Sequence, residues 1–157
     1  MGNPFPRILL AACTGMGLAL SGTVMQAVLR NPLADPYLMG VSSGASMGAV
    51  CFIFFGTGTF FGSMGIGFGA FFGAVTVSFF LLSVTRKIQS QHTVYLLIIG
   101  AAASAVCSGI TGILIYTHAN SSGGDAALYW LMGSIADPHT DAVYVLGASV
   151  IILWIFC

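Results

Sequence analysis

Two of the three histidines, His118 and His139, could bind a metal ion or haem through an imidazole nitrogen. Their spacing does not define one site and both lie in a polar stretch, so we expect solvated loop histidines. The sequence has no Gly-x-x-x-x-Gly-Lys phosphate loop and no His-Glu-x-x-His motif, and we expect no Gly-x-Ser-x-Gly nucleophile elbow. We therefore predict no enzyme activity, no ATP hydrolysis, no metal site and no cofactor on this chain.

The composition has few charges for its apolar content. The 157 residues are 57% hydrophobic and 5% charged, whereas a soluble domain has about 25% charged residues. This balance excludes a cytosolic globular enzyme, a basic nucleic-acid binder, a disordered tail and a secreted disulfide scaffold. Each cysteine lies in an apolar run, where a thiol acts as a small hydrophobic side chain; these are Cys13, Cys51, Cys107 and Cys157. We predict an all-α, polytopic transmembrane helix bundle.

Five apolar segments reach or approach the length of about 20 residues that a membrane-spanning helix needs. They are continuously apolar and do not alternate as strands would. The segments cover residues 8–29, 37–55, 64–84, 94–117 and 142–157. We treat residues 1–157 as a single transmembrane domain, with an outer interfacial segment at 126–135, where Tyr129 and Trp130 suit a membrane surface.

Basic residues lie in the first and third connections, at Arg30, Arg86 and Lys87, whereas the fourth connection carries three Asp and no Lys or Arg. Cationic connections remain in the cytoplasm, so the N-terminal stub with Arg7 is expected outside. That orientation needs a preceding helix or a cleaved signal, and we expect no signal because too few apolar residues lie between Arg7 and the cleavage-like box at residues 10–13. At the other end, the last apolar run continues to Cys157. We therefore expect an internal fragment of a longer protein.

Small residues recur every four positions on three predicted helices. Such residues let helix backbones approach closely in a membrane. The stripes are Gly40, Gly44 and Gly48; Gly65, Gly69 and Gly73; and Gly100, Ser104, Ser108 and Gly112. One interpretation is that all three stripes are packing surfaces. The other is that one of them, with the stripe on the fourth predicted helix as the first candidate, lines a path where two copies meet. Spacing alone does not distinguish these two interpretations.

A polar turn joins the first two predicted helices. Pro32 ends the first helix after Asn31, because Pro cannot continue the hydrogen-bond ladder and disfavours helical geometry in the residue before it. Asp35 is expected to cap the second helix, with Pro36 at its first position. These features by themselves indicate a tight cytoplasmic turn.

The longest distinctive string surrounds this turn. It reads LSGTVMQAVL at residues 20–29, RNPLADP at 30–36 and LMGVSSGA at 38–45. The string closely resembles the signature of the FecCD-type permeases, and YWLMGS at 129–134 resembles that family's outer-loop motif. The resemblance covers essentially the whole chain and about half of a family member.

The resemblance implies a ten-helix permease of an ATP-binding-cassette importer in the cytoplasmic (inner) membrane of a bacterium, with five of its helices in this chain. Such a permease works as a homodimer with two ATPase subunits and an extracytoplasmic substrate-binding protein, and no nucleic acid is expected. The implied cargo is an iron-siderophore, haem or cobalamin-type chelate. The alternative is a small self-contained oligomeric membrane channel or scaffold protein whose glycine stripes mediate assembly.

The resemblance also implies roles for particular residues. The family's path-lining helix matches the fourth predicted span and implies path positions at Gly100, Ser104, Ser108 and Thr111. Arg7 matches one arginine of the family's Arg-x-Pro-Arg segment, which docks the binding protein, and Pro4 stands at the position of the other. The signature turn contains Asn31, Pro32, Asp35 and Pro36.

Overall fold

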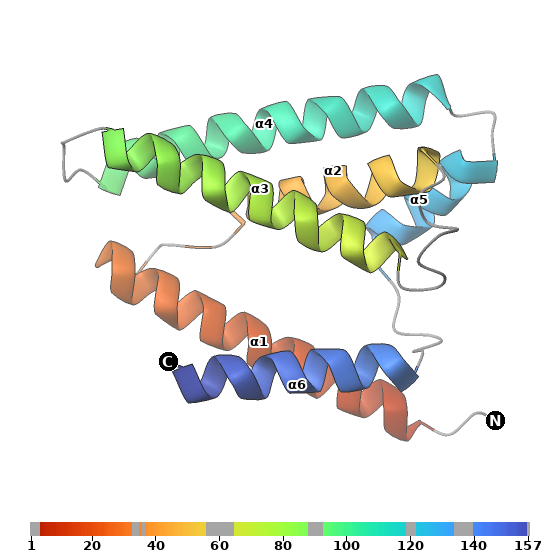
Figure 1. The fold of residues 1–157 in the computed structure, drawn as a ribbon, viewed down its shortest axis with the longest axis horizontal. Helices are drawn as coiled ribbons and strands as arrows, with labels where there is room; N and C mark the ends of the chain where they lie inside the picture. Colours follow the sequence, from red (N-terminus) through yellow and green to blue (C-terminus); the bar gives the residue numbers. More distant parts are fainter. Residues whose placement is uncertain are drawn as a thin grey trace. The chain divides into compact units, whose positions relative to one another are not determined.

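The structure, a computed structural model, describes residues 4–32, 35, 37–55, 65–87, 93–118, 122–133 and 140–156. Every regular element in these ranges is an α-helix, which confirms the all-α prediction. The helices form two compact groups, each considered by itself: α1 with α6, and α2 with α3, α4 and α5 (Figure 1).

The first group consists of α1 (Phe5–Leu29) and α6 (Thr140–Phe156), which lie side by side (Figure 1). Proline is placed in the first turn of α1, where a missing N–H leaves no helical bond unmade. A Cβ added at Gly17 would lie 3.4 Å from Cγ2 of Val150, at the edge of ordinary van der Waals contact, so the two helices pack closely here with room for a small side chain. Only 6% of the apolar window of α1 is buried. A helix that is apolar all round with so little cover requires lipid or further protein around it.

The second group is built around α2 (Val41–Phe54), which contacts α3 (Gly65–Lys87), α4 (Thr93–Thr117) and α5 (Ser122–Met132). The contact of α2 with α3 is the most extensive, whereas α3 and α4 touch little. The fully buried side chains of Ala49 and Val50 lie on α2. Because α2 is the shared neighbour, it determines where the other three helices lie within this group.

The second predicted helix begins later than expected. Residues 37–40 form turns, in which Leu38 N donates to the Asp35 carbonyl at 3.0 Å and Gly40 N to the Tyr37 carbonyl at 3.3 Å. The prediction that Asp35 caps this helix is wrong, because its carboxylate accepts a hydrogen bond from Tyr37 N at 2.8 Å. Gly40 is the N-cap residue instead, in a left-handed conformation that glycine tolerates. Pro36 lies outside the described residues.

The other helix ends differ less from the prediction. α1 begins at Phe5 instead of residue 8, and α3 ends at Lys87 instead of residue 84. Of the segment predicted at 126–135, residues 126–132 lie in the helix α5, which begins at Ser122 and has Asp125 in its first turn, and residues 134–135 lie outside the described part of the chain. A carboxylate there is favoured by the positive end of the helix dipole, which accounts for the earlier start.

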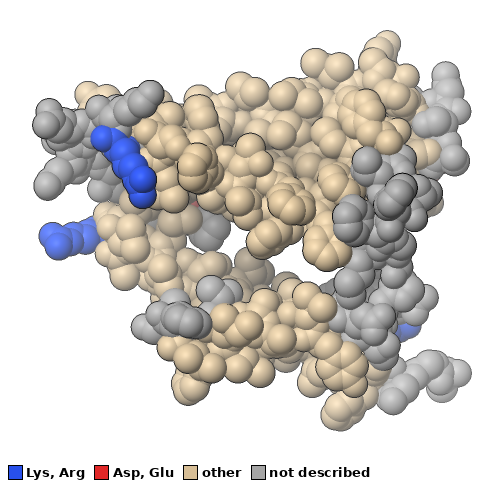
Figure 2. Space-filling view, viewed as in Figure 1, with Lys and Arg blue, Asp and Glu red and all other residues tan. Residues whose placement is uncertain are grey.

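Three helices among the described residues are long and apolar enough to cross a membrane, over Phe5–Leu29, Gly65–Val84 and Val94–Thr117. α2 has 14 residues and α6 has 17, so both are shorter than the roughly 20 that cross the hydrocarbon. Much of the apolar surface is exposed, and Figure 2 shows a face on which nearly all described atoms belong to uncharged residues. Phe79 is 71% exposed and Tyr116 84%. This surface suits contact with lipid or further helices.

Candidate functional site

Glycines of α2 and α3 bring these two helices into backbone contact. We call Gly44 and Gly48 of α2 with Gly69 and Gly73 of α3 the glycine seam. A Cβ at Gly44 would lie 2.8 Å from the Gly73 carbonyl oxygen, and a Cβ at Gly48 would collide with the carbonyl oxygen of Gly69. The seam has room for hydrogen atoms only, so it fixes the separation of α2 and α3 through van der Waals contact.

A second close contact joins the start of α2 to α4. Gly40, at φ +74°, packs on the backbone of Gly100 and Ser104, and a Cβ at Gly100 would lie 2.8 Å from the Met39 Cα. The Ser43 and Ser104 hydroxyl oxygens are 2.6 Å apart and share a hydrogen bond across the two helices. Gly40 therefore precedes α2 and faces α4, so it does not form one face with the seam glycines as predicted.

The four predicted path positions do not line one surface. Gly100 and Ser104 lie in the contact with the start of α2. Thr111 is buried, and its hydroxyl donates to the Cys107 carbonyl at 2.9 Å. Ser108 alone is exposed. Within this group of helices, Gly100, Ser104 and Thr111 are positions of internal packing.

The exposed side of α4 carries a set of small residues, of which the sequence stripe predicted only Ser108 and Gly112. They recur at spacings of three and four, which is the signal that could have identified them, and they are Ala101, Ala105, Ser108, Gly109 and Gly112. A Cβ at Gly109 or Gly112 would meet nothing within 4 Å. We call these five residues the open face of α4. It has the composition of a surface that another helix can approach closely.

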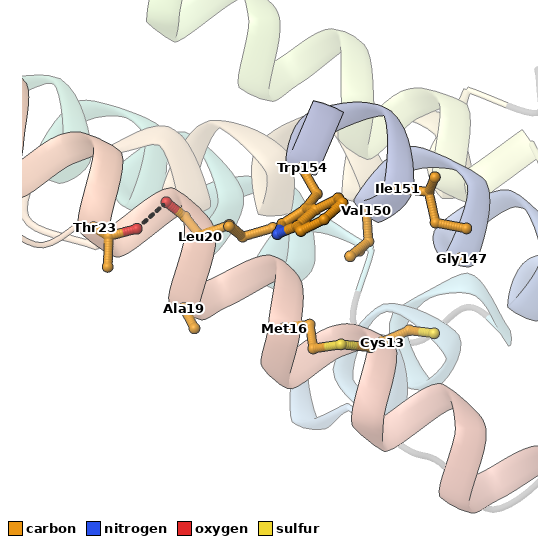
Figure 3. A pocket seen from close by; sticks show the side chains of 9 residues that line it. All are labelled: Cys13, Met16, Ala19, Leu20, Thr23, Gly147, Val150, Ile151 and Trp154. Atoms are coloured by element: carbon orange, nitrogen blue, oxygen red, sulfur yellow. Dashed lines mark hydrogen bonds between the residues drawn. The ribbon is translucent and has the colours of Figure 1, made fainter. Parts of the chain in front are cut away.

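Each group of helices also has an apolar cavity. In the first group a cavity of about 530 Å³ lies between α1 and α6 (Figure 3). Its lining includes Met16, Leu20 and Trp154, and its one hydroxyl, that of Thr23, donates to the Leu20 carbonyl at 2.9 Å. In the second group a cavity of about 470 Å³ is lined by α2, α3 and α4. Neither lining includes a charged side chain or a histidine, so these cavities can hold apolar groups, and their most reactive side chains are the thiols of Cys13 and Cys107.

His118 lies at the C-terminal end of α4 and is exposed. Its Nδ1 is 3.0 Å from the Leu114 carbonyl and 3.0 Å from the Thr117 hydroxyl, and its ring stacks on Phe54 with centroids 4.5 Å apart. A carbonyl oxygen only accepts, so Nδ1 carries a proton in that bond and is not a free metal ligand. Among the described residues, no three His, Cys, Asp or Glu side chains group as a metal site. His139 lies outside this part of the chain.

The spacing Gly-x-Ser-x-Gly does occur in the sequence, at residues 40–44 and 44–48, so the expectation that it is missing is wrong. A nucleophile elbow places its serine on a sharp turn between a strand and a helix. Ser42 and Ser46 both lie within the helix α2, and the residues described before it form turns. Their glycines serve the two close helix contacts, which explains the spacing without catalysis.

The remaining predicted site residues lie at the two ends of α1. Arg7 is exposed in the first turns of the helix. Asn31 and Pro32 follow its end, and the Asn31 N–H donates to the Gln26 carbonyl at 3.2 Å. Gly65, the last of the predicted packing glycines, is buried at the start of α3.

Comparison with known proteins places these features in context. The model of the FecCD transport family matches residues 4–157. The molybdate import system permease protein MolB of Haemophilus influenzae is 37% identical over 139 residues, covering 87% of this chain and 39% of that protein. The vitamin B12 import system permease protein BtuC of Salmonella arizonae is 36% identical over 153 residues, covering 97% of this chain and 45% of that protein.

A solved structure has the same fold. It is an inward-facing conformation of a transporter assigned to the metal-chelate ABC type, with a TM-score of 0.79 and 30% sequence identity. The match covers 94% of this chain and 46% of that chain. The chain thus spans about half the length of the relatives that it matches.

Proposed function

Because this chain belongs to the FecCD transport family, we propose that it forms part of the membrane-spanning permease subunit of an ATP-binding-cassette importer. The observation that carries the proposal is the family match over residues 4–157, which includes every described helix. The self-contained channel or scaffold alternative has no comparable support, since the relatives named above are import permeases.

The proposed cargo is a metal chelate of the iron-siderophore, haem or cobalamin type. The vitamin B12 permease and the metal-chelate transporter among the similar proteins support this class. The molybdate permease adds an oxyanion as the competing cargo. Neither apolar cavity has a charged group to recognise either cargo, so we propose that selectivity resides largely in the binding protein.

The proposed assembly has two copies of the permease in the cytoplasmic membrane of a bacterium, two ATPase subunits that hydrolyse ATP, and an extracytoplasmic substrate-binding protein. The open face of α4, with Ser108 at its middle, is the proposed side of the path. Gly100, Ser104 and Thr111 would then pack on the side of α4 that faces away from the path and hold the helix in position. Their packing partners within the chain favour this division of roles.

Uptake by the complete gene cluster tests the proposal. A bacterial strain without its own chelate and molybdate permeases would receive the complete permease gene with its ATPase and binding-protein genes. We expect uptake of a labelled chelate that is lost when the permease gene is deleted. Uptake of labelled molybdate alone would assign the oxyanion class instead, and no uptake of either cargo would refute the importer.

Arg7 is the proposed contact with the binding protein, because it is exposed at the end of α1 and matches the family's docking segment. Arg7→Glu should weaken binding of the docking protein by about tenfold at low salt, since a like-charge contact replaces an attractive one. Arg7→Lys, which keeps the charge, is the control. The difference should shrink at high salt, where exposed charges are screened, and wild-type affinity of Arg7→Glu at low salt would rule Arg7 out.

A further inference from the structure

Arg30 ends α1 in a backbone conformation that residues with a Cβ rarely adopt, at φ 48° and ψ 37°. Its N–H donates to the Ala27 carbonyl at 3.3 Å, and the Asn31 N–H donates to the Gln26 carbonyl at 3.2 Å. These two bonds define a Schellman motif, in which the left-handed residue is usually glycine. Among the residues that the structure describes, Arg30 alone has positive φ without being glycine.

The other two residues with positive φ in the described part of the chain are glycines. Gly133 follows α5 at φ +72°, and Gly40 precedes α2 at φ +74°. Glycine at position 30 would remove the clash that a Cβ makes in the left-handed region. The reversal cannot readily move to Asn31, because Pro32 disfavours helical conformations in the residue before it. An Arg in this strained conformation, where glycine would be unstrained, indicates a use for its side chain, since strained residues cluster at functional sites.

The position of Arg30 along α1 suggests what the side chain meets. α1 has 25 residues, so it is about 37 Å long at about 1.5 Å per residue. A bilayer has about 30 Å of hydrocarbon and about 40–45 Å with its headgroups. Arg30 is exposed directly after the last helical residue, which is the depth of the phosphates when α1 spans the membrane. The planar guanidinium can donate two parallel hydrogen bonds to one phosphate group.

We propose that Arg30 binds the phosphate of an anionic phospholipid at the C-terminal end of α1, and that this contact stabilises the left-handed residue. The competing partner is a carboxylate of an ATPase subunit. The depth of Arg30 favours lipid, because an ATPase domain lies beyond the headgroups. The proposal requires α1 to span the bilayer and is independent of which cargo is transported.

Four forms of the complete protein separate the charge from the backbone strain. Wild type and Arg30→Lys keep both, Arg30→Gln keeps the strain and loses the charge, and Arg30→Gly loses both. Each is placed in nanodiscs of phosphatidylcholine alone or with phosphatidylglycerol, and thermal unfolding is followed. We expect phosphatidylglycerol to raise the Tm of the wild type by about 3 °C more than that of Arg30→Gln or Arg30→Gly. Arg30→Lys should respond between these limits, because an ammonium keeps the charge but cannot donate two parallel hydrogen bonds. In phosphatidylcholine alone, Arg30→Gly should unfold at or above the wild-type Tm.

Three results would overturn the proposal. Arg30→Gln and Arg30→Gly could keep the full response to phosphatidylglycerol, which would assign that response to other cations. The Tm of Arg30→Gly could lie below that of the wild type by the same amount in both lipids, which would show that Arg30 stabilises the protein by packing and not by binding lipid. The lipid response could persist while the charge-free variants stop co-purifying with the ATPase, which would identify the ATPase as the partner. Failure of transport with an intact lipid effect would count only against the importer.

Discussion

Gly48→Leu is expected to abolish accumulation of the folded protein. Gly48 lies in the glycine seam, where even a Cβ would collide with the Gly69 carbonyl oxygen and approach the Gly73 Cα to 3.0 Å. Overpacking a rigid contact costs about 1–3 kcal/mol, occasionally more, and both neighbours here are backbone that cannot rotate away. The yield of monodisperse protein after detergent extraction, measured by fluorescence-detected size exclusion, should fall at least about tenfold, since about 1.4 kcal/mol corresponds to a factor of ten.

The matched control is Gly67→Leu, on α3 itself. Gly67 is exposed, and a Cβ there meets nothing within 4 Å. The added side chain should leave the yield near that of the wild type, because it faces lipid or empty space. Gly44→Leu should behave like Gly48→Leu, since a Cβ at Gly44 would lie 2.5 Å from Cγ2 of Val77. Equal yields of Gly48→Leu and Gly67→Leu would show that the seam does not hold α2 against α3.

Gly40→Ala is the second substitution with a large expected effect. The position combines φ +74° with a Cβ site 2.9 Å from both the Gly100 carbonyl oxygen and Ser104 N. The left-handed conformation costs an alanine about 1–2 kcal/mol, and the close packing adds a further loss of about 1–3 kcal/mol. The start of α2 should therefore separate from α4, with loss of the Ser43–Ser104 hydrogen bond. The measurement is the free energy of unfolding in mixed micelles.

Gly133→Ala is the control that separates these two contributions. Gly133 has φ +72°, yet a Cβ there meets nothing within 4 Å. The free energy of unfolding of Gly133→Ala should fall only by the cost of the left-handed conformation, about 1–2 kcal/mol. The difference between the two variants measures the packing of Gly40 on α4. Equal losses would mean that the contact with Gly100 contributes nothing to stability.

The residues around the first turn illustrate how far the sequence alone reaches. The string at residues 20–45 was sufficient to predict the FecCD family, which the match over residues 4–157 confirms. The apolar runs predicted the helices to within a few residues, except at the start of α2. That error arose because Asp35 and Pro36 have the types of residue that begin a helix, whereas the turns at 37–40 delay the start to Val41. Local signals state where a helix can begin, and tertiary contacts choose among the possibilities.

The candidate site shows more clearly what the sequence alone cannot predict. Gly100, Ser104, Ser108 and Thr111 follow helical spacing, yet Gly100 and Ser104 lie in the contact with the start of α2, and Ser108 is exposed. Periodicity places residues on one side of a helix, but it does not say which neighbour that side meets. Only the packing of α2 against α4 distinguishes the covered side of α4 from its open face.

The composition and the local order of residues were enough to predict that this protein lies in a membrane, that it is helical and which family it belongs to. A chain with 5% charged residues cannot remain in water, and long apolar runs satisfy their backbone groups in a membrane only as helices or closed barrels. The tertiary structure decided that α2 is the central helix, that Gly40 faces α4 while Gly44 and Gly48 face α3, and that Arg30 takes a left-handed turn. These features depend on which backbones approach within van der Waals distance, and residue spacing along one helix carries no information about its neighbour.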